Sequence, residues 1–323
     1  WKWFELSHAG RGMVMNFPDS KDRAPVTLID WIQKNKSVYP FQGKYKDIRG
    51  TRLHYLDEGK GQPVFCLHGN PTWSFFYRNL VPLLSTSHRV IVPDHIGCGL
   101  SDRPPEPKYK YTLQSRVDDF SSLVDEVAPS GKVDLVLHDW GGMIGTAWAV
   151  ANPHRVRKLV FFNTSGFSLP KGRQLPFSLK LCRFGPIGAL LVRGLNLFCL
   201  GAARYCSIRG LSKGAREGFL MPHGTWKDRL SVLRFVQDIP MQQGDDAYEL
   251  VQKTERSLGV LKEIPKIFCW GRKDFVFDDA FLEGWKEVFP DAAFHVFENT
   301  GHYLLEDSLQ EIAPKVVEFL GQP

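Results

Sequence analysis

The 323-residue sequence lacks the features that mark several classes of protein. Its six cysteines form no Cys-x-x-Cys pair and no disulfide-framework spacing, and its histidines and cysteines do not have the spacing of metal ligands. No uncharged apolar run reaches the ~18–20 residues of a membrane span; the richest stretch, 184–203, is interrupted by Arg193 and several glycines. The Gly97-Cys98-Gly99 motif lacks the third glycine of a dinucleotide site, and basic residues are not interleaved with aromatics. We therefore expect no metal, no cofactor, no membrane span and no nucleic-acid partner.

The cysteine and charge contents indicate the cellular compartment and the kinds of partner that the protein could bind. Cys66 and Cys269 lie in apolar stretches where a thiol usually behaves as a small hydrophobic group, so we expect a reducing compartment and a cytoplasmic location. The hydrophobic content of 43% and the charged content of 24% are ordinary for a globular protein. The formal net charge of +6 is unevenly placed, because residues 165–253 hold 13 Lys and Arg against 6 Asp and Glu. Such an excess is typical of a solvated face, but it also suits a carboxylate-bearing substrate or a docked partner.

Short apolar runs alternate with helical periodicity along most of the chain. A hairpin is predicted over 45–55, with its turn at Arg49-Gly50. Strands are predicted at 63–67, 88–92, 133–137, 156–162, 264–270 and 293–297, and helices at 26–34, 75–84, 117–127, 142–151, 279–289 and 309–320. This alternation indicates an α/β fold with a mostly parallel, doubly wound sheet.

The alternation breaks at about Asn163 and resumes near residue 264. The stretch between contains glycine, proline and apolar clusters but no clear strand. We therefore divide the chain into an N-terminal extension (1–42), an α/β core (43–164 and 256–323) and a helical cap (165–255). Apolar cap residues suit an apolar tunnel over a site, although a helix packed on the main domain gives the same composition: Leu190, Leu191, Leu195, Leu197, Phe198 and Leu200. The extension and the cap are both candidates for self-association into a homo-oligomer.

The stretch from Val133 to Gly142 predicts a buried strand that ends abruptly and is followed at once by a helix. Strand, sharp turn and helix are typical of a nucleophile elbow, which lifts one side chain off the end of a sheet into a pocket. Asp139 occupies the lifted position. A carboxylate at this position can attack carbon directly and form an ester with the enzyme.

Other polar residues follow the predicted strands, and ligands of such sheets bind outside the carboxyl ends of the strands. Asp274 follows the strand at 264–270, and His302 follows the last strand. The residues Asp139, Asp274 and His302 follow one another along the chain in the order nucleophile, acid, histidine. In these roles His302 is expected to act as a general base and Asp274 to orient its imidazole. The alternative position for the acid, at the end of the strand 156–162, holds the uncharged Asn163, so we assign the acid to Asp274.

Two neighbouring motifs are interpreted as structural. Residues 93–102, with Asp94 and two glycines, predict a turn held by Asx hydrogen bonds. His68 is expected to brace the loop that follows the strand 63–67 rather than to transfer a proton.

Three motifs together resemble those of a known family: His68-Gly69-Asn70-Pro71-Thr72, His138-Asp139-Trp140-Gly141-Gly142 and Gly301-His302. They are similar to those of the haloalkane dehalogenases of the α/β-hydrolase superfamily, and the resemblance covers about residues 43–320. It implies an α/β-hydrolase fold in which Asp139 displaces halide from an sp3 carbon and His302 activates water to hydrolyse the resulting ester. It also implies that Asn70 and Trp140 hold the halide, and that their backbone N–H groups form the oxyanion hole. This set is similar to that of the third dehalogenase subfamily.

The main prediction is therefore a haloalkane dehalogenase that acts on a small apolar halogenated substrate and gives alcohol, halide and a proton. Members of the subfamily also resemble the β-lactone decarboxylases of long-chain olefin synthesis, in which the same Asp attacks a strained lactone and CO2 leaves. The long apolar cap and its additional arginines suit a long-chain lactone.

Two further alternatives are weaker. An epoxide hydrolase needs acids such as paired cap tyrosines, of which only Tyr205 and Tyr248 are available, and Asn70 replaces the usual bulky apolar residue. A non-catalytic binding module is disfavoured because all the catalytic residue types are present.

Overall fold

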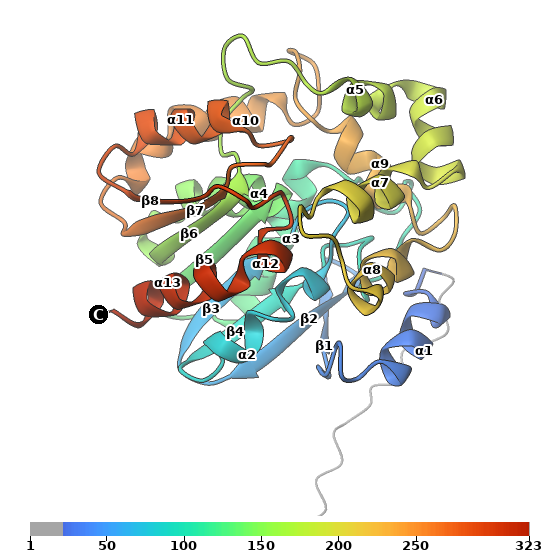
Figure 1. Ribbon diagram of the computed structural model, residues 1–323, viewed down its shortest axis with the longest axis horizontal. Coiled ribbons are helices and arrows are strands. Elements are labelled where there is room, and N and C mark those ends of the chain that lie inside the picture. The colour runs from blue at the N-terminus through green and yellow to red at the C-terminus, as the bar shows by residue number, and fades with distance from the viewer. Residues whose placement is uncertain (1–21, 323) are drawn as a thin grey trace, which may run out of the picture.

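The computed structural model describes residues 22–322, and a sheet of eight strands runs through this part of the chain (Figure 1). The strand order is β1-β2-β4-β3-β5-β6-β7-β8. Strands β1, β2 and β4 pair antiparallel, and every other pairing is parallel. The strands are β1 (Lys44–Ile48), β2 (Thr51–Gly59), β3 (Gln62–Leu67), β4 (His88–Pro93), β5 (Val133–Asp139), β6 (Val156–Thr164), β7 (Lys266–Gly271) and β8 (Ala293–Phe297). The predicted mostly parallel sheet is confirmed.

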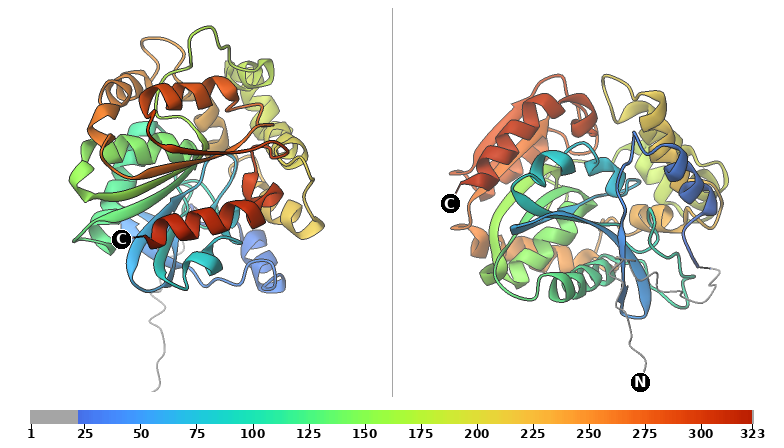
Figure 2. Two further views of the ribbon diagram at one scale, coloured as in Figure 1. Left: turned by 60° about the vertical axis from the view of Figure 1, so that its left-hand side comes forward. Right: turned by 90° about the horizontal axis from the view of Figure 1, so that it is seen from below.

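Helices cover both faces of the sheet (Figure 2). Successive side chains of a strand point to opposite faces, so a central parallel strand must be apolar on both. Leu135 and Leu137 of β5 pack into one core with α3, α4 and α11, while Val136 packs into a second core with α2 and α13. The helices outside the long insertion are α1 (Val26–Lys34), η1 (Ser74–Tyr77), α2 (Val81–Leu84), α3 (Leu113–Val127), α4 (Trp140–Ala151), η2 (Pro153–Arg155), α11 (Asp279–Val288), α12 (Leu304–Asp307) and α13 (Leu309–Gly321).

A long insertion, residues 165–265, separates β6 from β7 and contains helices but no strand. We call it the inserted segment. It holds α5 (Phe177–Arg183), α6 (Gly185–Ala189), the π-helix η3 (Leu190–Gly194), α7 (Leu197–Tyr205), α8 (Lys213–Leu220), η4 (Met221–His223), α9 (Leu230–Gln237), α10 (Tyr248–Arg256) and η5 (Leu258–Leu261). Helices α5, α6, α7 and α9 gather at one end of the sheet (Figure 1). The absence of strand predicted for this stretch is confirmed.

Within residues 22–322, no single helix is long and apolar enough to cross a membrane. One pair, Gly185–Gly194 with Leu197–Tyr205, has the required length and composition together, but it is bent by 65°.

Several predicted elements differ from those observed. The helix predicted at 75–84 is broken into η1 and α2, because Pro82 has no N–H to donate and its ring clashes with the carbonyl group one turn earlier. Helix α12 was not predicted. The hairpin turn at Arg49-Gly50 is confirmed, with φ values of 53° and 79° at its two central residues. Of the predicted extension, the helix at 26–34 is observed as α1, and residues 1–21 lie outside the described residues.

Candidate active site

Asp139 is the last residue of β5, and α4 begins at the next residue, Trp140. Its backbone has φ 51° and ψ −128°, a strained conformation for a residue with a side chain. Two glycines allow the loop after β3 and the start of α4 to pack closely around Asp139. A Cβ at Gly69 would lie 1.9 Å from Asp139 Oδ1, and one at Gly141 would lie 2.1 Å from the carbonyl oxygen of Leu67. The predicted elbow is present, and it holds Asp139 at the carboxyl edge of the sheet.

The Asp139 carboxylate is buried against backbone donors. Its Oδ1 accepts a hydrogen bond of 2.6 Å from the N–H of Asn70, and the N–H of Trp140 also donates to the carboxylate. Burial raises the pKa of Asp139, and the charge of His302 and the two N–H donors oppose the rise only in part. The two N–H groups named from the resemblance thus converge on the Asp139 carboxylate, the arrangement that an oxyanion hole requires.

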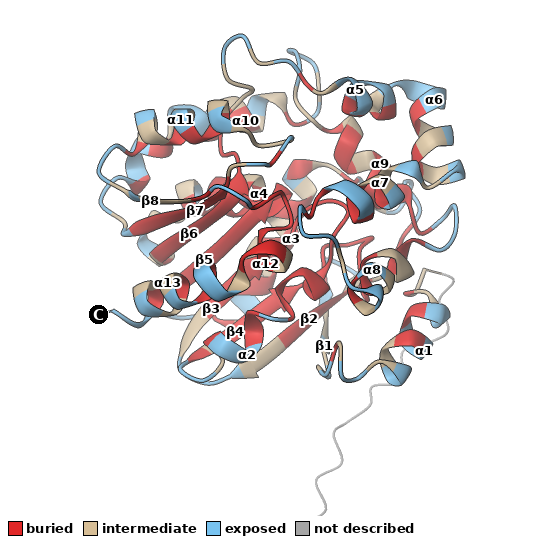
Figure 3. Cartoon of the chain, viewed as in Figure 1, coloured by how far each residue is buried: buried red, intermediate tan, exposed pale blue. Residues whose placement is uncertain are grey.

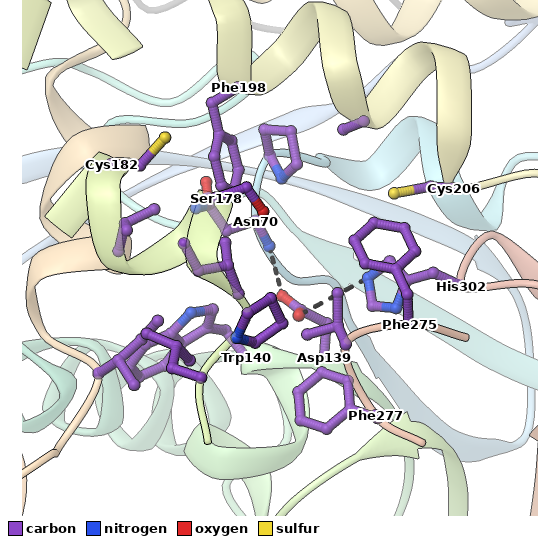
Figure 4. Close-up of a pocket in the computed structure, with 18 of the residues that line it drawn as sticks. Asn70, Asp139, Trp140, Ser178, Cys182, Phe198, Cys206, Phe275, Phe277 and His302 are labelled. Atoms are coloured by element: carbon purple, nitrogen blue, oxygen red, sulfur yellow. Dashed lines mark hydrogen bonds and ion pairs between the residues drawn. The ribbon is translucent and has the colours of Figure 1, made fainter. Parts of the chain in front are cut away.

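His302 lies between the two carboxylates (Figure 4 shows it beside Asp139). Its Nδ1–H donates to Asp274 Oδ2 at 2.7 Å, and its Nε2 lies 3.7 Å from Asp139 Oδ2. Burial alone would lower the pKa of His302, but the charge and hydrogen bond of Asp274, with the charge of Asp139, raise it above its ordinary value. The 3.7 Å separation exceeds a hydrogen bond. The Nε2 is therefore available to a water molecule that approaches an ester on Asp139.

The loop after β7 positions Asp274. Its Oδ1 accepts from the N–H groups of Val276 and Phe277, at 2.7 and 3.1 Å, which leaves Oδ2 for His302. Asn163, the alternative acid position, clamps the start of this loop: its Oδ1 accepts from Gly271 N–H at 2.7 Å, and its Nδ2 donates to the Gly271 carbonyl at 3.0 Å. The structure thus places Asp274, and not Asn163, beside His302.

Asn70 and Trp140 both face the cavity above Asp139. Asn70 Nδ2 donates one hydrogen bond, to the Val232 carbonyl of α9 at 3.2 Å, and a side-chain amide has a second N–H to offer. The indole N–H of Trp140 makes no hydrogen bond to any residue within 22–322, and its ring packs on Phe235 with centroids 5.4 Å apart. Two N–H donors are therefore free to meet an anion formed beside Asp139.

The remaining polar residues of these motifs are structural. His68 Nε2 accepts from the backbone N–H of His95 at 3.1 Å, and the His95 ring donates to the His68 carbonyl at 2.9 Å. His138 donates to the His302 carbonyl at 3.0 Å and stacks on Phe76. Burial lowers the pKa of His68 and of His138, so both rings are neutral braces. The predicted bracing role of His68 is confirmed.

The turn after β4 also matches its prediction. The carboxylate of Asp94 accepts from the backbone N–H groups of Ser74 and Leu100, at 2.6 and 2.8 Å, and from the His54 ring. These bonds shape the loop that packs behind the site.

A cavity of about 440 Å³ opens above Asp139, Asn70 and His302 (Figure 4). Its walls are mainly apolar, with Leu179, Leu191 and Phe198 from the inserted segment and Phe277 from the core. Of the six apolar cap residues expected to form the tunnel, Leu191, Leu197 and Phe198 line it, whereas Leu190, Leu195 and Leu200 do not and are exposed at the surface. The cavity therefore suits a substrate with apolar chains, but half of those residues were assigned to it wrongly.

Two aromatic residues of the cavity were not predicted from the sequence. Phe275 and Phe277 were not singled out, although both line the cavity and the Phe277 ring stacks on His302 at 6.0 Å. Their only sequence signal is their place directly after Asp274. Tyr248 is not among the residues that line the cavity, so the tyrosine pair of an epoxide hydrolase is not assembled there.

The fold and the elbow define an α/β hydrolase, and the chain belongs to that family: the family model described as alpha/beta hydrolase fold matches residues 62–309. A cis-3-alkyl-4-alkyloxetan-2-one decarboxylase of Shewanella oneidensis is 45% identical over 88% of this chain and 90% of that protein. A protein of the same name from Xanthomonas campestris is 39% identical over 87% and 97%. Haloalkane dehalogenase 2 of Mycobacterium tuberculosis is 29% identical over 88% and 96%.

Solved structures agree on the fold. A haloalkane dehalogenase from Bradyrhizobium elkanii superposes with a TM-score of 0.78 at 23% identity, covering 87% of this chain and 96% of that one. The predicted resemblance and fold are confirmed. The more similar relatives carry the name that was the alternative, and the dehalogenases are more distant.

Proposed function

We propose that this protein decarboxylates a cis-3-alkyl-4-alkyloxetan-2-one, a four-membered lactone with two alkyl chains, to an alkene and CO2. One observation carries the proposal: relatives at 45% and 39% identity over nearly the whole chain are named for this activity, whereas the mycobacterial dehalogenase is 29% identical. The comparisons thus favour the lactone alternative over the dehalogenase that the sequence analysis put first. The site geometry supports the chemistry as follows.

The first step opens the ring at its alkyl carbon. A carboxylate oxygen of Asp139 attacks C4 of the lactone, the ring C4–O bond breaks, and its electron pair leaves on the ring oxygen as a carboxylate. The product is an alkyl ester on Asp139 that carries a carboxylate on the adjacent carbon. The free N–H donors of Asn70 and Trp140 face the cavity where this anion forms, and donors aimed at developing charge lower the barrier.

The second step releases both products without water. The C3–carboxylate bond breaks, its electron pair becomes the C3=C4 double bond, and the C4–O bond to Asp139 breaks to restore the carboxylate. No proton is gained or lost over the two steps. Attack by Asp139 inverts C4, and the carboxylate on C3 and the Asp139 oxygen on C4 then leave from opposite faces. The net result is the same as losing CO2 from one face of the ring, so a cis lactone gives a cis alkene.

The apolar cavity supports this reaction because one negative charge passes from Asp139 to the substrate carboxylate and back, and no charge is neutralised. A low-dielectric wall such as that formed by Leu179, Leu191 and Phe198 strengthens the hydrogen bonds to the leaving carboxylate. It also destabilises the free carboxylate relative to neutral CO2, which favours the second step.

The test is turnover of a synthetic cis-3,4-dialkyl-oxetan-2-one by the purified protein, with the cis alkene measured by gas chromatography. Asp139→Asn, which keeps the size of the side chain but removes the nucleophile, should abolish alkene formation while the protein keeps its native circular dichroism. Alkene formation by Asp139→Asn at the rate of the unaltered protein would refute the role of Asp139. Absence of alkene with the unaltered, folded protein would refute the proposed function.

Haloalkane dehalogenation remains the second candidate, because one feature favours it: His302 and Asp274 form a base dyad that the lactone route does not use to move a proton. Hydrolysis of an alkyl ester on Asp139 needs such a base. With a bromoalkane, the unaltered protein would release bromide over many turnovers, and His302→Ala would stop after one turnover and retain a mass increase on Asp139. With the lactone, His302→Ala should still turn over repeatedly, and turnover in ¹⁸O-labelled water should leave Asp139 unlabelled.

A further inference from the structure

The inserted segment exposes a group of large apolar side chains. Phe177 and Phe184 at the two ends of α5 are 78% and 68% exposed, and Leu190 in η3 is 56% exposed. We call the following set the apolar patch: Phe177, Phe184, Ile187, Leu190, Leu195, Leu197 and Leu200. Exposed apolar residues that occur singly need no explanation, but a contiguous group marks an interaction site.

The patch residues occupy neighbouring elements and repeat at helical spacing. Phe177, Leu181 and Phe184 stand at i, i+4 and i+7, and therefore lie along one side of α5 and of the residue that caps it. Leu197, Leu200 and Arg204 stand at i, i+3 and i+7 and lie along one side of α7. Helix α5 contacts α6, α6 contacts η3, and η3 contacts α7, so the stripes lie on adjoining elements. Figure 3 shows exposed residues along α5 and α6 at the outer end of the molecule.

The charge around the patch has one sign. Residues 165–216 contain nine Lys and Arg and no Asp or Glu. Arg173 is paired with Asp278 and Arg183 with Asp245. Lys180 and Arg204, on the same helices as the patch, form no ion pair within the described residues. The Arg193 guanidinium lies 4.4 Å from the ring centroid of the half-exposed Trp226. Apolar side chains flanked by unpaired cations and a tryptophan match the interfacial zone of an anionic bilayer.

The patch is continuous with the entrance of the cavity. Leu181, Leu197 and Tyr205 are each exposed to solvent and also line the cavity above Asp139. A surface that holds the patch against a membrane would therefore bring the cavity mouth to the same membrane.

We propose that the apolar patch docks this protein on the surface of an anionic phospholipid bilayer, with Lys180 and Arg204 at the headgroups, and that an alkyl substrate enters the cavity from the bilayer. The docking stands on the patch and its charge alone, and the entry of substrate rests on the proposed function. A second copy of the chain is a poorer occupant. A symmetric dimer through the patch would press two segments without acids against each other, and like charges in an interface repel.

Vesicle flotation tests the docking without any substrate. The unaltered protein should float with vesicles of phosphatidylglycerol and phosphatidylethanolamine and bind vesicles of phosphatidylcholine far more weakly. Phe184→Glu and Leu190→Glu, which do not line the cavity, should each weaken binding about tenfold, because a buried apolar side chain is replaced by a charge repelled by the lipid. Lys180→Gln and Arg204→Gln should each weaken binding to the anionic vesicles about fivefold.

A matched control lies on η5, which packs on α4 and α10. The side chain of Val260 on this helix is 51% exposed, a fraction similar to the 56% of Leu190. The Val260→Glu variant should therefore float with the vesicles like the unaltered protein. Equal loss in Val260→Glu, equal binding to phosphatidylcholine, or no flotation at all would overturn the proposal. A dimer in light scattering that Phe184→Glu dissociates would also overturn it in favour of a second copy. Flotation without lactone turnover would refute the proposed function alone, and lactone turnover without flotation would refute the docking alone.

Discussion

The indole N–H of Trp140 can be removed with little change of shape by Trp140→Phe. The ring is only 8% exposed and packs on Phe235, so phenylalanine keeps most of the apolar contact. The N–H that is lost has no hydrogen-bond partner within residues 22–322 and faces the cavity. The substitution therefore removes one donor to the anion that leaves from the substrate, and leaves the donor of Asn70 in place.

The expected loss follows from the general effect of such donors. Removing one donor to a developing oxyanion costs about 10²–10³-fold in kcat, or about 2.7–4 kcal/mol. Since the Asn70 amide still faces the same place, we expect the lower end, about 10²-fold in kcat for lactone decarboxylation. The smaller ring should lower the free energy of unfolding by only about 1 kcal/mol, because it leaves a small void against Phe235.

The assay compares kcat for alkene formation and the free energy of unfolding in urea for two variants. Trp148→Phe is the control, because Trp148 lies on the same helix, is 2% exposed, packs on Phe120 and does not line the cavity. It should lose comparable stability and keep kcat within about twofold of the unaltered protein. A loss in Trp140→Phe of less than about threefold, or an equal loss in Trp148→Phe, would refute the donor role of Trp140.

Three further results are expected. Burial raises the pKa of Asp139, and the ionised carboxylate is the active form, so kcat/KM for the lactone should begin to fall, as the pH is lowered, at a higher pH than it would with an ordinary carboxylate. The pKa of His302 is also raised, and its neutral form is the base, so the rate of bromide release alone should show a second increase with pH. A pH profile with the same two limbs for both substrates would contradict this assignment. Asn163→Leu should lower the free energy of unfolding by about 1–3 kcal/mol and reduce kcat, because the polar groups of Gly271 lose their partner; unchanged urea unfolding would argue against the clamp. Gly141→Ala should lower the free energy of unfolding by about 1–3 kcal/mol, since the new Cβ meets the Leu67 carbonyl. Gly259→Ala, whose new Cβ would lie in open space, should leave thermal unfolding unchanged.

The positions of the candidate catalytic residues were predictable, because each depends only on where a strand of the sheet ends. Asp139 ends β5, while Asp274 and His302 follow β7 and β8, and the carboxyl ends of parallel strands meet at one edge. Their order along the chain supplied the roles. Asn163 also lies near the carboxyl end of a strand, within β6, but its clamp on Gly271 depends on a contact between β6 and β7 that no local pattern shows.

The inner and outer faces of the inserted segment were not predictable from periodicity. In α7, for example, Phe198 lines the cavity whereas Leu200 is exposed at the surface, so the apolar periodicity of this helix does not select one face. The π-helix from Leu190 to Gly194 also departs from the period of 3.6, and α7 is bent by 65° from the helices before it. Leu191 and Leu197 line the cavity, whereas Leu190 and Leu195 face solvent.

The elbow does not by itself separate a haloalkane from a lactone, because the first step is the same for both. In each proposed reaction Asp139 would attack an sp3 carbon, an anion would leave, and the donors of Asn70 and Trp140 would receive it. The substrates differ only in what remains on the ester. A halide departs and leaves an ester that only water and His302 can release, whereas the lactone keeps its leaving carboxylate attached, where it can expel Asp139 by losing CO2. Selection between the two reactions therefore lies with the substrate that reaches the cavity, so residues at its mouth, such as Leu181 and Leu197, bear on function as much as the triad does.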